Sequence, residues 1–223
     1  MAQRIVIVNP NSTEAVTAGI SRSVEPLRSI DGPRIDCVTL EAGPPGIETQ
    51  AHIDGVVAPL LARLERENAD AAVIACFSDP GLKAARAETD RPVFGIAESA
   101  FHAALSEGRR FGILAILEAS SVRHRRYIAA LGLSEGFAES RPLNLGVLDL
   151  QDRDRTFARL LEVGKTLRDN DKADVLVLGC AAMPRYQQAL AEALGLPVVE
   201  PCRAAAEAAL AALAELEPAR PNL

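Results

Sequence analysis

Short apolar runs alternate with longer amphipathic segments from one end of the chain to the other. Apolar runs of strand length lie at 4–9, 35–40, 71–77, 92–97, 111–116, 137–145, 174–180 and 196–201. Apolar residues at helical spacing fill the intervals at 12–27, 51–68, 80–88, 98–108, 120–132, 153–170, 184–195 and 202–216. This alternation is typical of parallel strands joined by crossover helices, so we predict an α/β fold.

The central and C-terminal parts of the chain repeat one local pattern. Cys76 matches Cys180 and Pro80 matches Pro184, each 104 positions later, within segments that align from strand to helix. Chance similarity of two alanine-rich helices does not explain cysteines and prolines in register. We therefore predict an internal duplication of a four-strand unit.

The duplication predicts two similar lobes, each a four-stranded parallel sheet flanked by helices. A pseudo-twofold axis is expected to relate them, with the functional site in the cleft between. We place the first lobe at 1–98 with 202–223 and the second at 99–201.

Composition and charge narrow the classes of partner. The 223-residue chain has a net charge of −6 and only 4% aromatic residues, with no basic block. Nucleic acid and anionic membrane are therefore not expected as partners. No apolar run approaches the roughly 20 residues that span a bilayer, and the N-terminal run is too short for a signal peptide. We expect a cytoplasmic homo-oligomer that acts on a small molecule.

Four cysteines are the main candidates for chemistry: Cys37, Cys76, Cys180 and Cys202. They form no C-x-x-C pair and none has a histidine at zinc-ligand spacing, so no metal is expected. Nucleotide-binding and metalloprotease motifs are missing as well, which disfavours a nucleotide cofactor and a metalloprotease. Disulfides are not expected in a reducing cytosol. We interpret Cys37 and Cys202 as structural thiols.

Cys76 and Cys180 both end a predicted strand, where parallel α/β sheets bind ligands. A helix is predicted to start just after each, and its positive N-terminus is expected to lower the pKa of the thiol. Facing lobes would place the two sulfurs on opposite sides of a ligand. One thiolate could then remove a proton from a carbon acid while the other thiol returns one, inverting the stereocentre without a cofactor. Backbone N–H groups of the turns would stabilise the enolate oxygen.

Four motifs resemble one enzyme family: "VNPNST" (8–13), "GPPGIET" (43–49), "CFSDPGL" (76–82) and "LGCAAMP" (178–184). They resemble the aspartate/glutamate/hydantoin racemase superfamily and, within it, the hydantoin and allantoin racemases. The resemblance implies cofactor-independent racemisation of a 5-substituted hydantoin or allantoin, with Cys76 and Cys180 as the acid/base pair. The substrate-binding residues implied are Asn11, Gly46, Ile47, Glu48, Phe77, Ser78, Ala181 and Ala182.

Two positions depart from the family pattern. Glycine is common among such racemases where this chain has Ser78 and Ala182, so a narrower pocket is expected. Alternatives stay open: a decarboxylase or a cis–trans isomerase of a small diacid on the same fold, or a non-catalytic ligand-binding module. The decarboxylases of the family use a single cysteine, so the intact pair disfavours the first.

Several polar residues have two interpretations. Asp79 is expected to cap the helix opened by Pro80, rather than to act as an acid. Asn11 or Ser12 is expected to cap the first helix, and Asn11 can also bind substrate. Glu48 is either a solvated loop charge or a ligand contact.

The histidines and the basic cluster are not the favoured candidates for catalysis. His52, His102 and His124 lie on predicted helices, so a Cys–His pair is disfavoured but open. The cluster at 121–127 is interpreted as a solvated helix face or an oligomer contact.

Overall fold

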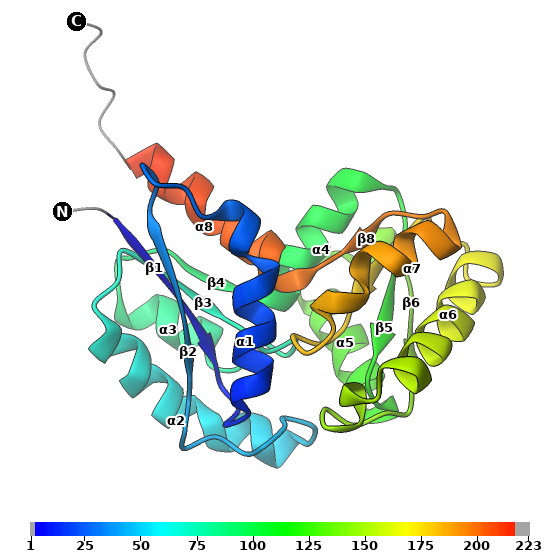
Figure 1. Ribbon diagram of the computed structural model, residues 1–223, viewed down its shortest axis with the longest axis horizontal. Coiled ribbons are helices and arrows are strands. Elements are labelled where there is room, and N and C mark those ends of the chain that lie inside the picture. Colours follow the sequence, from blue (N-terminus) through cyan, green and yellow to red (C-terminus); the bar gives the residue numbers. More distant parts are fainter. Residues whose placement is uncertain (1–2, 217–223) are drawn as a thin grey trace, which may run out of the picture.

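The computed structural model describes residues 3–216, which form two four-stranded parallel sheets. The strands of the first sheet are β1 (Arg4–Asn9), β2 (Arg34–Thr39), β3 (Ala71–Ile74) and β4 (Val93–Gly95). Those of the second are β5 (Phe111–Ala115), β6 (Phe137–Pro142), β7 (Val175–Leu178) and β8 (Val198–Val199). The strand orders, β2-β1-β3-β4 and β6-β5-β7-β8, are equivalent. The predicted duplication and fold class are therefore confirmed (Figure 1).

Helices cover the sheets on both faces, as the parallel strands require. They are α1 (Glu14–Ser23), α2 (Gln50–Glu67), α3 (Leu82–Glu88), α4 (Ile96–Glu107), α5 (Glu118–Ala130), α6 (Arg153–Asp169), α7 (Gln187–Leu194) and α8 (Pro201–Leu216). Short 3₁₀ turns lie at η1 (Glu25–Leu27), η2 (Ser134–Gly136), η3 (Asp149–Gln151) and η4 (Pro184–Tyr186). Both faces of the central strands are buried, which explains their continuous apolar sequence.

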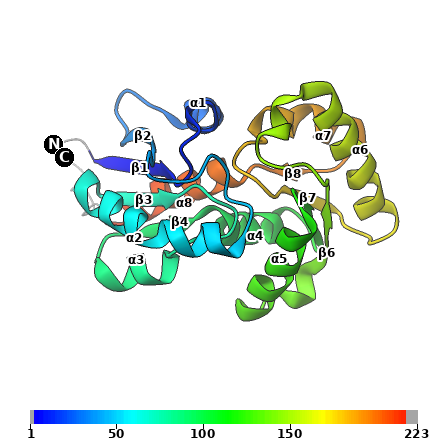
Figure 2. The ribbon, with the colours of Figure 1, turned by 90° about the horizontal axis from the view of Figure 1, so that it is seen from below.

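Helices α4 and α8 cross between the lobes. Helix α4 follows β4 of the first sheet but packs on β7, β5 and β8 of the second, whereas α8 follows β8 and packs on β3, β4 and β1. The two helices also pack against each other at the junction (Figures 1 and 2). This reciprocal crossing is the symmetry expected of two lobes related by a pseudo-twofold axis. The exact lobe bounds, 1–98 with 202–223 and 99–201, stay a prediction, and 1–2 and 217–223 lie outside the described residues.

The two central strands end earlier than the sequence predicts. Strand β3 stops at Ile74 and β7 at Leu178, so Cys76 and Cys180 lie in the turns that follow. Each turn folds back on itself: the Asp79 N–H donates to the Cys76 carbonyl at 2.9 Å, and the Met183 N–H to the Cys180 carbonyl at 3.2 Å. The cysteines therefore lie past the sheet edge, at equivalent places in the two lobes.

Candidate active site

Cys76 and Cys180 line one small cavity between the lobes. Its volume is about 30 Å³, far below the roughly 300–1,000 Å³ of a typical ligand pocket, so the cavity is narrow in this structure. Of the residues predicted to bind substrate, six line it together with the cysteines: Asn11, Ile47, Phe77, Ser78, Ala181 and Ala182. The remaining two, Gly46 and Glu48, lie beside the cavity and contact the second lobe instead.

Burial dominates the electrostatics of both thiols. It raises the pKa of Cys76 to about 12 and that of Cys180 to about 11. The predicted lowering is therefore wrong, because neither thiol receives more than one backbone N–H. The Ser78 N–H favours the Cys76 thiolate, and the Ala182 N–H donates to Cys180 Sγ at 3.5 Å. Helix α3 begins only at Leu82, too far along the chain to offer its N-terminus.

Helix α5 contributes an arginine to the cavity that sequence reasoning missed. Arg123 lines it, and its Nη2 donates to the Glu48 carbonyl and to Ser120 Oγ, both at 3.0 Å. Burial lowers the pKa of this guanidinium, while the Cys76 thiolate raises it. Arg123 therefore supplies a positive charge that favours ionisation of Cys76.

The predicted solvated face of α5 is wrong for its central residue. His124 is only 3% exposed, and with Ser121 and Ile128 it forms a buried stripe at helical spacing. That spacing, i, i+3 and i+7, is the signal that the many charges between these residues concealed.

His124 holds the turn that follows Cys76. Its Nδ1 lies 3.0 Å from Ser140 Oγ, the ring hydrogen-bonds to the Phe77 backbone, and its centroid lies 5.1 Å from that of the Phe77 ring, edge to face. Burial lowers the pKa of His124 to about 3, so the ring is neutral at pH 7. A neutral ring that hydrogen-bonds to both Ser140 and the Phe77 backbone is suited to positioning Phe77, not to activating a thiol.

Asp79 caps a different helix from the one predicted. Its carboxylate accepts from the N–H groups of Ala97 at 3.0 Å and Glu98 at 2.8 Å, at the start of α4. The Tyr127 hydroxyl of α5 also donates to it, at 3.0 Å. Gly95 permits this approach, because a Cβ there would lie 2.2 Å from Asp79 Cγ. The predicted cap on the following helix fails because Asp79 turns away with φ of 42° and α3 begins later.

Asn11 presents its amide to the cavity from the turn before α1. Its Oδ1 accepts from Asn9 Nδ2 and from the Thr13 N–H, each at 3.0 Å. The Nδ2 group is therefore the end left to meet a ligand. Helix α1 has Thr13 at its N-cap position, so the predicted cap at Asn11 or Ser12 is wrong by one or two residues.

The loop at 43–49 closes one side of the cavity by reaching the second lobe. Glu48 Oε1 accepts from the Val147 N–H at 2.7 Å, and the Glu48 carbonyl accepts from Arg123. Gly46 lies so close that a Cβ there would be 2.8 Å from Val147 Cβ. This contact between the lobes explains the glycine at position 46. Glu48 is not a solvated loop charge, because its carboxylate accepts a hydrogen bond from the second lobe.

Neither a metal cluster nor a membrane helix is found within residues 3–216. No group of three or more His, Cys, Asp and Glu side chains in this range could hold a metal ion. The helices of the same range are too short or too polar to cross a membrane.

Comparison with known proteins identifies the family. The model of the family described as Asp/Glu/Hydantoin racemase matches residues 5–209. The chain belongs to this racemase family. A hydantoin racemase of Pseudomonas sp. (strain NS671) is 34% identical over 202 residues, covering 88% of this chain and 80% of the relative. A hydantoin racemase of Paenarthrobacter aurescens is 34% identical over 213 residues, covering 92% and 89%.

A solved structure agrees with the sequence relatives. The allantoin racemase from Klebsiella pneumoniae superposes with a TM-score of 0.91 at 28% identity, covering 100% of this chain and 96% of that one. The protein is thus an isomerase of the racemase type, and the interpretation as a non-catalytic binding module is not retained.

Proposed function

We propose that this racemase inverts the stereocentre of a 5-substituted hydantoin or of allantoin by proton transfer between Cys76 and Cys180. The observation that carries the proposal is that the two thiols occupy equivalent turns of the duplicated lobes and line one cavity. The names of the relatives support the substrate class.

The proposed step moves one proton on each face of the substrate. The thiolate of one cysteine takes the proton from the ring carbon, so an S–H bond forms as the C–H bond breaks. The electron pair passes to the adjacent carbonyl oxygen, which becomes an enolate. The thiol of the other cysteine then donates its proton to the opposite face of the carbon, and the enolate collapses to the carbonyl. The two cysteines have then exchanged protonation states, and exchange of their protons with solvent restores them for the next turnover of the same enantiomer.

The electrostatics of the pair suit this exchange. A negative Cys180 raises the pKa of Cys76 further, so the loss of a second proton from the pair is disfavoured. The mixed state, one thiolate and one thiol, is the state that racemisation needs. A buried thiolate with a raised pKa is also a stronger base towards a weak carbon acid. Arg123 and the backbone N–H groups of the turns are proposed to stabilise the enolate oxygen.

Single enantiomers in deuterated water test the reaction. The protein is incubated with (R)- and with (S)-allantoin and with several 5-substituted hydantoins, and optical rotation and deuterium at the ring carbon are followed against protein-free blanks. We expect loss of rotation together with deuterium uptake for at least one of these substrates. No exchange with any of them would sink the substrate assignment.

Serine substitutions test the two thiols. Cys76→Ser and Cys180→Ser keep the size of the side chain but replace the thiol by a much weaker acid. We expect both to lose racemisation, each retaining at most exchange of one enantiomer. Cys37→Ser is the matched control, since Cys37 lies in β2 outside the cavity. Normal racemisation by either active-site variant would refute the two-thiol scheme.

A further inference from the structure

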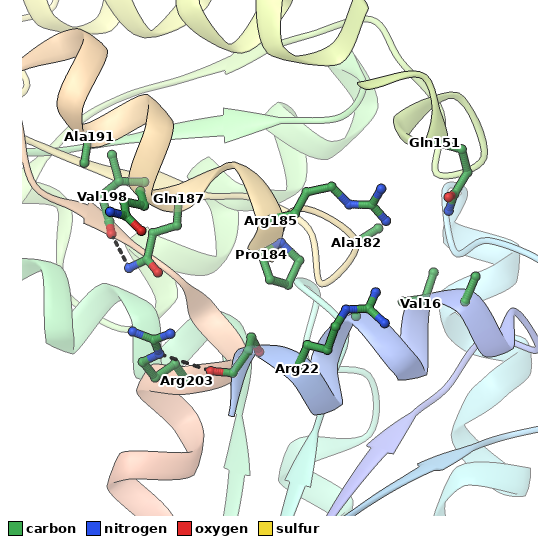
Figure 3. Close-up of a pocket in the computed structure, with 14 residues that line it drawn as sticks. Val16, Arg22, Gln151, Ala182, Pro184, Arg185, Gln187, Ala191, Val198 and Arg203 are labelled. Carbon is green, nitrogen blue, oxygen red and sulfur yellow. Dashed lines mark hydrogen bonds between the residues drawn. The ribbon is translucent and has the colours of Figure 1, made fainter. Parts of the chain in front are cut away.

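A second and much larger cleft lies beside the cysteine cavity. Its volume is about 610 Å³, within the range of ordinary ligand pockets. One wall comes from α1 and the start of α8, and the other from η4 and α7 (Figure 3). Val16 and Ala182 line both this cleft and the cysteine cavity, so the two adjoin at these residues.

The cleft is positively charged in a protein of net charge −6. Arg22, Arg185 and Arg203 line it, and among its described lining residues there is no aspartate or glutamate. None of these three arginines is in an ion pair within residues 3–216; Arg203 Nε donates to the Ser23 carbonyl at 3.2 Å. The remaining polar side chains of the lining are Ser23 and three glutamines, Gln151, Gln187 and Gln188.

The arginines come from both sides of the junction. Arg22 is on α1 and Arg185 on η4, and Figure 3 shows them on facing sides of the cleft with their guanidinium groups extending towards the same end. Guanidinium groups bind carboxylates and phosphates through paired, charge-assisted hydrogen bonds. An anion seated between Arg22 and Arg185 would meet donors from both lobes at once.

We propose that this cleft binds a small organic molecule that carries two or more carboxylate or phosphate groups. Arg22 and Arg185, which form no ion pair within residues 3–216, set the charge of the ligand, whereas Arg203 lies next to the buried Glu200 carboxylate. The volume of the cleft sets the size of the ligand above that of an inorganic ion. The glutamine amides offer hydrogen bonds to its neutral part. The cleft shares Val16 and Ala182 with the cysteine cavity, but the proposed binding rests on its arginines and not on the identity of the proposed substrate.

Calorimetric titration of the full chain tests the site, with citrate as a tricarboxylate and fructose 1,6-bisphosphate as a bisphosphate. Titrations at about 0.15 M salt screen unspecific attraction between exposed charges. We expect at least one of the two probes to bind with a stoichiometry of one. If only citrate binds, the cleft recognises carboxylates; if only the bisphosphate binds, it recognises phosphates. If both bind, it recognises the negative charge that they share.

Variants locate the binding. Arg22→Gln and Arg185→Gln each change an exposed side chain and should each weaken binding at least tenfold. Arg109→Gln is the matched control, an exposed arginine before β5 that does not line the cleft, and should leave binding unchanged. Cys76→Ser should also bind normally, whether or not the racemase proposal holds. The inference is overturned if neither probe binds, if both cleft variants bind as the wild type does, or if Cys76→Ser abolishes binding.

Discussion

Glu48 of the first lobe accepts a hydrogen bond of 2.7 Å from the backbone N–H of Val147 in the second. The same residue accepts from Arg123 through its carbonyl. These two bonds join the loop at 43–49 to the opposite wall of the cysteine cavity. Glu48 thus bridges the two lobes at one side of the cavity.

Removal of this carboxylate should therefore impair catalysis without unfolding the protein. Glu48→Ala leaves the Val147 N–H without its partner. The free energy of unfolding falls on the order of 1–3 kcal/mol when a buried group loses its partner, and by less for this part-buried one. We expect kcat/KM for racemisation to fall about tenfold, which corresponds to about 1.4 kcal/mol, with little change in the melting temperature. Glu48→Gln retains an acceptor and should keep most of the activity. Glu41→Ala, an exposed change near the same loop, is the control; equal kinetics for Glu48→Ala and the control would contradict the role.

Asp79 should make stability depend on pH. Burial raises its pKa to about 7 in the folded protein, against an ordinary value of 3.8. Between about pH 4 and pH 7 the unfolded chain has lost this proton while the folded chain keeps it, so the free energy of unfolding falls as the pH rises.

The comparison with Asp79→Asn isolates this effect, because the asparagine cannot titrate. Relative to that variant, the wild type should lose stability from pH 4 to pH 7, on the order of 1.4 kcal/mol for each unit separating the two pKa values. Below pH 4 and above pH 7 the difference should be flat. Urea unfolding of both proteins across this range measures it. A constant difference would mean that Asp79 stays ionised and is held by its three hydrogen-bond donors.

The elements of the fold were predictable because short continuous apolar runs alternate with segments of helical periodicity. The position of Cys76 relative to Cys180 was also predictable, since the duplication carries both into one register. The helix that Asp79 caps was not predictable. Local sequence points to the helix that follows Asp79, whereas the N–H groups that donate to its carboxylate belong to α4, which lies beside Asp79 only in the folded chain. Arg123 was missed for the same reason: no local pattern shows that α5 faces the cavity.

The direction in which the thiol pKa values shift could not be predicted from the sequence either. A strand-end cysteine suggests exposure to a helix N-terminus, but burial by the opposite lobe is a tertiary effect that outweighs the single N–H each sulfur receives. Gly46 illustrates the same point, since the sequence suggests it as a substrate-binding residue, whereas its close approach to Val147 is visible only in the folded chain.

Raised thiol pKa values predict the pH dependence of the reaction. If one thiolate is required and burial raises the pKa of Cys76 to about 12 and of Cys180 to about 11, the ionised fraction grows with pH throughout the neutral range. We expect kcat/KM to rise by up to tenfold per unit between about pH 7 and pH 10, after subtraction of the protein-free rate. A rate that is flat from pH 6 to pH 9 would show that a thiolate is already formed at neutral pH.

Arg123 offers the sharpest test of how the cavity controls that ionisation. Its positive charge lowers the pKa of Cys76 against the effect of burial. Arg123→Gln should therefore raise the pKa further, shift the pH–rate profile to higher pH and lower kcat at pH 7.5 by about tenfold or more. Because both thiol pKa values lie above the neutral range, this shift also lowers the rate by the same factor at each pH, so the lysine variant, and not the shape of the profile, distinguishes charge from packing.

Two further variants separate charge from geometry. Arg123→Lys keeps the charge but cannot make the same pair of bonds to Glu48 and Ser120, so its profile should stay near that of the wild type while KM rises. Arg126→Gln removes an exposed charge one turn along α5, outside the cysteine cavity, and should change neither quantity. If Arg123→Gln and Arg126→Gln gave the same profile, the charge of Arg123 would have no part in ionising Cys76.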